Sequence, residues 1–278
     1  MKISDVKGTV ALSNGVSMPY FGLGVFKSQN GKEVTDAIVH AINSGYRLID
    51  TAAIYNNEDG VGEAVKKSGV DRKDIWLTSK VWNTKQGYDN TIKAFYGSLS
   101  RIDTDYLDLY LVHWPIKDKF QETYRALETL YEEGRIRAIG VSNFSECHLD
   151  KLMQTAKITP MVNQIEFHPR LTQKSVVEKC KEMGIQVQSW SPLMRGGIFE
   201  INDLQKIANK YSKNVAQLIL RWNLQNGIAT IPKSANFRRI SGNSEIFDFN
   251  ISDEDMKFIN KLNRDMRIDR IPDDVECE

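Results

Sequence analysis

Four side chains of different chemistry stand at or just after the downstream ends of apolar, strand-like runs in the sequence. Asp50, Lys80 and His113 each end such a run, and Tyr55 comes five residues after Asp50. An aspartate keeps a neighbouring ammonium charged, and that ammonium lowers the pKa of a nearby phenol from about 10. An imidazole beside the phenol can orient a carbonyl group by hydrogen bonding. Together these residue types suit protonation of a carbonyl oxygen while another agent attacks the carbonyl carbon.

Each of these residues also has an ordinary structural explanation, and it is their joint placement that favours a site. The sequence shows no activated nucleophile and no cluster of residues at metal-ligand spacing, so we predict no metal site. Hydride from a bound nicotinamide fits the role of the attacking agent. A second hypothesis is a barrel lyase that forms a Schiff base on Lys80. Such a lysine needs an apolar pocket that keeps the amine neutral, whereas Asp50 argues for a charged one.

Apolar runs that alternate with helical patterns predict the elements that position these residues. Val34, Ala37, Ile38 and Ala41 repeat at the spacing of one helix face, and similar patterns recur along the chain. Eight strand and helix units close most economically as an α/β fold of the (β/α)8 or TIM-barrel type, in one domain over residues 1–278. The predicted strands lie near residues 20–26, 46–52, 75–81, 107–114, 136–142, 161–167, 185–191 and 228–232.

An N-terminal hairpin and two additional helices depart from the plain alternation. Asn14 and Gly15 are a signal for a two-residue turn between two short strands in residues 9–19, which we expect to cap the barrel. Residues 202–225 contain two helical stretches where a barrel needs one. A capping box that begins at Ser252 starts a further helix after the eighth strand.

Gly22 and Gly24 are the nearest approach to a dinucleotide-binding turn in the first predicted unit. They lie within the first strand, and no third glycine follows at the spacing that such a turn requires. A doubly wound sheet is therefore the less favoured fold.

The composition favours a small-molecule partner. The formal net charge is +1, the basic residues are scattered and 41% of residues are hydrophobic, so neither nucleic acid nor a membrane surface is an expected partner. The first residues contain no apolar signal core, and no stretch has the length of a membrane span. We expect a cytoplasmic protein that acts as a monomer.

The three cysteines are too few and too far apart to predict a disulfide framework or a zinc site. Cys147 and Cys180 fall on predicted helix faces, and Cys277 is interpreted as a thiol in the tail.

The sequence resembles the aldo-keto reductase superfamily over essentially its whole length. The matching motifs occur in order at residues 45–55 (GYRLIDTAAIY), 107–115 (LDLYLVHWP), 140–144 (GVSNF) and 231–234 (IPKS). The sequence looks closest to short microbial members that reduce glyoxal or methylglyoxal or 2,5-diketogluconate, and to members resembling prostaglandin F synthase. The resemblance implies that Tyr55 is the general acid, that Lys80 and Asp50 tune it, and that His113 orients the carbonyl.

The resemblance also implies NADPH as the cofactor. Lys233, Ser234 and Arg239 match residues that hold the 2′-phosphate, and Trp190 matches a residue that stacks on the nicotinamide, although a core aromatic explains it equally well. The remaining expected cofactor contacts are Gly24, Val25, Asp50, Ser142, Asn143, Gln164, Ser191, Leu193 and Asn243. Gly242 stands where many members have Glu or Gln.

The expected substrate contacts are Phe26, Trp82, His113 and Trp114. Arg195 is unusual, and we hypothesise that it contacts the cofactor pyrophosphate or an acidic substrate. The resemblance implies NADPH-dependent reduction of small aldehydes, with 2-oxoaldehydes such as methylglyoxal favoured. The alternative function is that of a nicotinamide-sensing regulatory subunit with the same fold, which would not be an enzyme.

Overall fold

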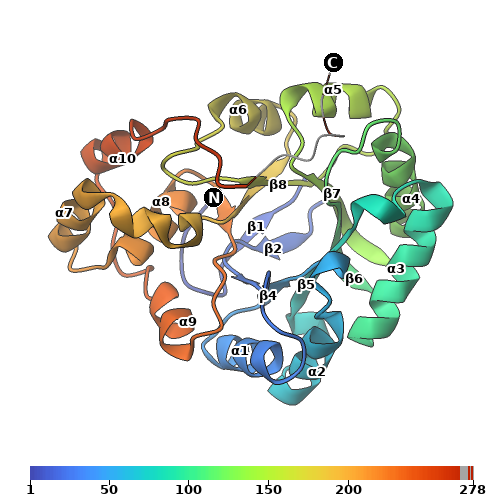
Figure 1. Cartoon of the computed structure of the whole chain (residues 1–278), viewed down its shortest axis with the longest axis horizontal. Coiled ribbons are helices and arrows are strands. Elements are labelled where there is room, and N and C mark those ends of the chain that lie inside the picture. Colours follow the sequence, from blue (N-terminus) through green and yellow to red (C-terminus); the bar gives the residue numbers. More distant parts are fainter. Residues whose placement is uncertain (270–274, 276, 278) are drawn as a thin grey trace.

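The computed structural model describes residues 1–269, 275 and 277 and contains a barrel of parallel strands (Figure 1). Each barrel strand is bonded to the next in chain order, and parallel bridges from Phe21 to Thr230 and from Gly24 to Lys233 join the first strand to the last. The predicted (β/α)8 fold is confirmed. The strands are β3 (Leu23–Gly24), β4 (Leu48–Asp50), β5 (Trp76–Val81), β6 (Leu107–Val112), β7 (Ile136–Ser142), β8 (Val162–Glu166), β9 (Gln186–Trp190) and β10 (Ala229–Thr230), preceded by β1 (Thr9–Ala11) and β2 (Ser17–Pro19).

Helices surround the barrel and bury their apolar faces against it (Figure 1). In α1, Val34, Ala37, Ile38 and Ala41 are all buried, as their spacing predicts. Among the described residues, no helix is both long and apolar enough to cross a membrane. The barrel helices are α1 (Lys32–Asn43), α2 (Glu58–Ser68), α3 (Tyr88–Ile102), α4 (Phe120–Glu132), α5 (Glu146–Met153), α6 (Lys174–Glu182), α8 (Val215–Gln225) and α9 (Phe237–Asn243).

The two additional helices are present as predicted. They are α7 (Asn202–Lys210), which precedes α8, and α10 (Asp253–Asn260) beyond the last strand. Ser252 caps α10, because its hydroxyl accepts a hydrogen bond from the Asp255 N–H at 3.2 Å.

Gly22 and Gly24 lie where the barrel closes. A Cβ atom at Gly22 would lie 2.3 Å from Cδ2 of Leu48, and one at Gly24 would lie 3.0 Å from the carbonyl oxygen of Ile231. Only glycine fits such close approaches of backbone to neighbouring strands. These glycines therefore serve strand packing, in agreement with the preference for a barrel over a doubly wound sheet.

The N-terminal hairpin has a longer turn than predicted. The Leu12 N–H donates to the Val16 carbonyl oxygen at 2.9 Å, which leaves three residues in the turn. The predicted two-residue turn is wrong, because Gly15, with φ 82°, occupies the left-handed position that ends a three-residue turn. The Asn14 amide donates to the Arg137 carbonyl oxygen at 3.0 Å and so ties the hairpin to the start of β7.

A disulfide joins Cys147 in α5 to Cys277, across 130 positions of sequence. The prediction that these were separate thiols is wrong, because the fold brings the end of the chain beside α5 (Figure 1). His148 supports the same contact with its Nε2 atom 2.8 Å from the Val275 carbonyl oxygen. Cys180 on α6 is a free, buried thiol, and burial raises its pKa to about 11.

Replacing Cys147 with Ser should lower the free energy of unfolding by about 2–4 kcal/mol, because the disulfide restricts the unfolded chain. Urea unfolding of the variant and the parent without reductant measures the loss. Cys277→Ser should give the same loss, and adding dithiothreitol should make all three proteins unfold alike. Equal midpoints without reductant would show that the disulfide contributes no stability.

Candidate active site

A cavity of about 1180 Å³ opens at the C-terminal ends of the barrel strands. Asp50, Ser142 and Trp190 are the last residues of β4, β7 and β9, and each lines the cavity. Its volume is above the usual range of about 300–1,000 Å³ for ligand sites, so it can hold more than one small molecule. The predicted site residues that line it are Gly24, Phe26, Asp50, Tyr55, Trp82, His113, Trp114, Ser142, Asn143, Gln164, Trp190, Ser191, Leu193, Lys233, Ser234, Arg239 and Asn243.

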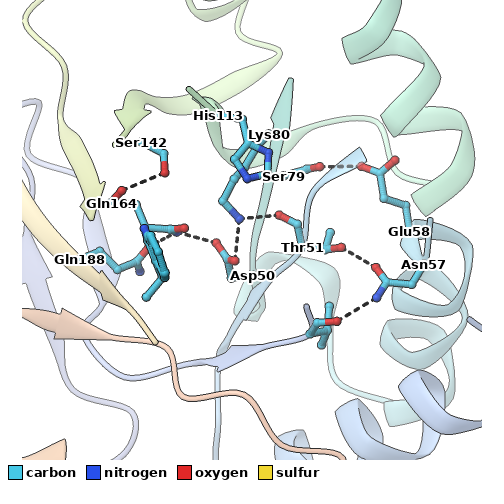
Figure 2. Close-up of polar contacts among 12 residues, drawn as sticks. Asp50, Thr51, Asn57, Glu58, Ser79, Lys80, His113, Ser142, Gln164 and Gln188 are labelled. Atoms are coloured by element: carbon cyan, nitrogen blue, oxygen red, sulfur yellow. Dashed lines mark hydrogen bonds and ion pairs between the residues drawn. The ribbon is translucent and has the colours of Figure 1, made fainter. Parts of the chain in front are cut away.

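Lys80 and Asp50 form a buried ion pair at the wall of this cavity (Figure 2). The Lys80 Nζ atom lies 2.6 Å from Asp50 Oδ1 and also donates to the Thr51 carbonyl oxygen at 2.8 Å. Lys80 is fully buried, and Asp50 is 2% exposed. Burial lowers the pKa of Lys80, and the Asp50 carboxylate acts in the opposite direction. The neighbouring strands β4 and β5 therefore hold the two groups in contact, as predicted.

Buried hydrogen bonds on both sides hold this ion pair in place (Figure 2). The Gln164 amide donates to Asp50 Oδ2 and to Gln188 Oε1, both at 2.7 Å. On the other side, the Thr51 hydroxyl donates to Asn57 Oδ1 at 2.7 Å. Thr51, Asn57 and Gln188 were not predicted as site residues, because no motif in the sequence marks them. Such a network fixes the geometry of the groups that it bonds.

Tyr55 ends the 3₁₀ helix Ala53–Tyr55, which follows β4. Its ring centre lies 5.2 Å from Lys80 Nζ and 5.9 Å from the centre of the His113 ring. Burial raises the pKa of Tyr55 well above 10.0, and the Asp50 charge adds to this. The net shift is therefore opposite to the predicted lowering, because the desolvation of a phenolate is the largest effect. The phenol stays protonated at neutral pH and is available as a proton donor.

His113 follows β6 and faces the same cavity. Burial lowers its pKa well below 6.5, and the charge of Lys80 acts in the same direction. The Trp82 ring packs edge-on against the imidazole at 5.0 Å, and the Asn143 amide donates to the His113 carbonyl oxygen at 3.0 Å. A neutral imidazole carries one N–H, so His113 can donate a hydrogen bond without being a charged acid.

A row of polar side chains crosses the ends of β7, β8 and β9. The Trp190 indole N–H donates to Asn143 Oδ1 at 2.9 Å, and the Asn143 amide donates to the Ser142 hydroxyl at 3.0 Å. The Ser142 hydroxyl in turn donates to the Gln164 carbonyl oxygen at 2.8 Å. Trp190 is half-buried and lines the cavity, so it is not a plain core residue.

Val25 lies apart from the other predicted cofactor contacts. Its side chain is fully buried and does not line the cavity, and its N–H donates to the Asp50 carbonyl oxygen at 3.1 Å. Neighbouring side chains in extended backbone point to opposite sides, and Gly24 and Phe26 are the ones that face the cavity.

Lys80 also does not line the cavity. A fully buried amine bonded to a carboxylate cannot reach a substrate carbonyl, so the geometry disfavours the Schiff-base hypothesis.

A second part of the cavity is basic. Lys233, Arg238 and Arg239 line it beside Ser234. The Ser234 hydroxyl accepts from the Asn236 N–H at 3.1 Å, and Asn236 Oδ1 accepts from the Arg239 N–H at 3.1 Å. These bonds hold the loop between β10 and α9 in a defined shape. Three cations beside a hydroxyl are suited to an anion with several oxygens.

Gly242 leaves open space beside this basic region, since a Cβ atom there would meet nothing within 4 Å. Its carbonyl oxygen accepts from the Gln217 amide at 2.9 Å, and Gln217 and Glu245 also line the cavity. Sequence analysis missed Gln217 and Glu245. Gln217 forms a capping box with Asn214 at the start of α8, and this signal predicts a helix end rather than a ligand contact.

Aromatic and apolar side chains surround the mouth of the cavity. Phe26, Trp82 and Trp114 line it as predicted, and the Phe26 ring centre lies 5.0 Å from that of Tyr55. Ile54 and Phe199 also line the mouth, and they are 38% and 58% exposed. Neither was predicted from the sequence, because an isolated apolar residue carries no signal of its own.

Comparison with known proteins gives one consistent result. The model of the Aldo/keto reductase family matches residues 17–264. Glyoxal reductase from Bacillus subtilis is 57% identical over 98% of this chain and 99% of its own length. Methylglyoxal reductase DkgA from Escherichia coli is 40% identical over 95% and 96% of the two chains. The crystal structure of a Bombyx mori aldo-keto reductase in complex with NADP superposes with a TM-score of 0.90 at 34% identity, and covers 97% of this chain and 96% of that one.

The family match spans most of the chain, and the relatives agree over nearly their full lengths. Together with the closed barrel and the residues at its C-terminal end, these comparisons show that the protein belongs to the aldo-keto reductase family.

Proposed function

We propose that this protein reduces small aldehydes and ketones to alcohols with NADPH, and that 2-oxoaldehydes such as methylglyoxal are favoured substrates. The observation that carries the proposal is that Tyr55 and His113 face one cavity with the buried Lys80–Asp50 pair beside them. Relatives named as reductases of glyoxal and methylglyoxal support this substrate class.

In the proposed mechanism, the carbonyl carbon would receive hydride, which is the chemistry that NADPH would supply when bound. Tyr55 donates its proton to the carbonyl oxygen, and the neutral His113 donates a hydrogen bond to the same oxygen. Lys80 stabilises the phenolate that remains on Tyr55, and Asp50 keeps Lys80 charged and in position. The Phe26 and Trp82 rings exclude water from these groups.

The residues of the cavity fit NADPH. Amide and hydroxyl groups of Ser142, Asn143 and Gln164 would hold the carboxamide of the nicotinamide close to Tyr55. Lys233 and Arg239 would bind the 2′-phosphate, for which the guanidinium offers two parallel donors. The nicotinamide complex of the Bombyx mori relative supports this cofactor.

The direct test follows NADPH oxidation with methylglyoxal, glyoxal, aromatic aldehydes and keto acids. We expect turnover, with the highest kcat/KM for the 2-oxoaldehydes. NADPH binding without turnover of any carbonyl compound would instead support a regulatory subunit.

Replacing Arg239 with Gln should raise the Kd for NADPH about 10- to 100-fold, the loss expected for charge-assisted hydrogen bonds to a phosphate. The Kd for NADH, which lacks that phosphate, should change by less than about twofold. Fluorescence titration with both cofactors measures the difference, and Arg125→Gln on the exposed surface of α4 is the control. If the Kd values for NADPH and NADH rose by the same factor, Arg239 would not recognise the 2′-phosphate.

A further inference from the structure

An ion pair between Arg195 and Asp269 lies at the mouth of the cavity. The two residues are 74 positions apart, and both line the cavity. Their side chains are 38% and 39% exposed, so solvent and ligand can reach both. Arg195 has φ 52°, and the Gly196 that follows has φ 103°. A left-handed backbone is uncommon for a non-glycine residue, and it marks a side chain whose direction the surrounding structure determines.

The Phe26 ring connects this ion pair to the catalytic centre. The Arg195 guanidinium carbon lies 5.7 Å from the centre of the Phe26 ring. The centre of the Tyr55 ring lies 5.0 Å from the same point. The charges of Asp269 and Arg195 also act on the pKa of Tyr55, in opposite directions. The guanidinium and the phenol therefore both lie against Phe26.

The charges around Phe26 do not balance. Lys27 is exposed, with its Nζ atom 5.4 Å from the Phe26 ring centre, and it also lines the cavity. Lys27 and Arg195 thus both lie against this ring, and Asp269 forms an ion pair with Arg195. Asp50, the nearest other acid of the wall, is bonded to Lys80. Counting the described residues alone, the surroundings of Phe26 carry an excess of positive charge.

We propose that Arg195, together with Lys27, binds an anionic group at the far end of the carbonyl substrate, and that Asp269 occupies this position when no such substrate is bound. The inference rests on the proposed reductase function and adds a second class of substrate to the 2-oxoaldehydes. That class is aldehydes in which roughly an aromatic ring or a short chain separates a carboxylate from the carbonyl. The substrate carboxylate would replace Asp269 on the guanidinium, and exposed ion pairs contribute so little net stability that the exchange is easy.

The test compares two aldehydes that differ in charge and by one methyl group. 4-Carboxybenzaldehyde is the anionic substrate, and its methyl ester, methyl 4-formylbenzoate, is the neutral one; each is assayed with saturating NADPH. The measured quantity is the ratio of kcat/KM for the acid to kcat/KM for the ester. Arg195→Gln should lower this ratio about tenfold, and Lys27→Gln should lower it about two- to fivefold. Asp269→Asn should raise it about two- to fivefold, because the competing carboxylate is gone.

Arg125→Gln is the matched control, since that arginine also forms an exposed ion pair but lies on α4 away from the cavity. An Arg195→Gln variant that keeps the parent ratio would overturn the inference. A variant that binds NADPH more weakly with an unchanged ratio would also overturn it, and would assign Arg195 to the cofactor. If the parent protein reduces methylglyoxal but neither of these aldehydes, the inference alone fails. If it reduces none of the three, the proposed function fails as well.

Discussion

The Tyr55→Phe variant should lose carbonyl reduction by a factor of about 10² to 10⁴ in kcat/KM, the range for removal of a general acid. The change removes one oxygen atom and keeps the ring, so the contacts with Phe26 at 5.0 Å and His113 at 5.9 Å remain. Since burial already raises the pKa of Tyr55, the resting enzyme carries this proton at neutral pH. The loss should therefore appear in kcat over the whole neutral range.

Binding measurements separate this loss from a folding defect. NADPH should bind Tyr55→Phe with a Kd within about threefold of the parent value. Tyr96→Phe is the control, because Tyr96 is a 43% exposed tyrosine on α3 outside the cavity, and it should keep full activity. If Tyr55→Phe reduced methylglyoxal at the parent rate, another group would have to supply the proton.

The fold was predictable because the barrel depends on local patterns. Each strand that is buried on both faces reads as a continuous apolar run, and each helix shows its buried face at intervals of three and four residues. The turn of the N-terminal hairpin was less predictable. Asn14 and Gly15 suit turns of two or three residues, and the pairing of Leu12 with Val16 decides between them.

Contacts between distant segments were not predictable from the sequence. The Cys147–Cys277 disulfide and the Arg195–Asp269 pair both join the C-terminal tail to parts of the barrel that no motif connects to it. The pKa of Tyr55 is a further case. The sequence indicates a lysine near a phenol, whereas the extent of burial, which sets the direction of the shift, is a property of the packed structure.

The Lys80→Met variant should lose both activity and stability. Lys80 is fully buried against Asp50, so its removal leaves a buried carboxylate whose remaining side-chain partner among the described residues is the Gln164 amide. Breaking such a pair from one side costs about 3–5 kcal/mol. We expect Tm to fall by roughly 6–15 °C in a chain of this size. Loss of the ammonium should also lower kcat/KM by at least about 100-fold, because no cation then stabilises the phenolate of Tyr55.

Adding Asp50→Asn to Lys80→Met separates the two effects. The double variant removes the uncompensated charge, so thermal unfolding should show a Tm closer to that of the parent. Its kcat/KM should stay as low as that of Lys80→Met, because a neutral amide and a thioether cannot stabilise a phenolate. Lys93→Met, at an exposed position on α3, controls for the loss of a lysine and should match the parent in both measurements. Recovery of turnover in the double variant would mean that Lys80 supports the fold alone, and that burial by itself prepares Tyr55 to donate its proton.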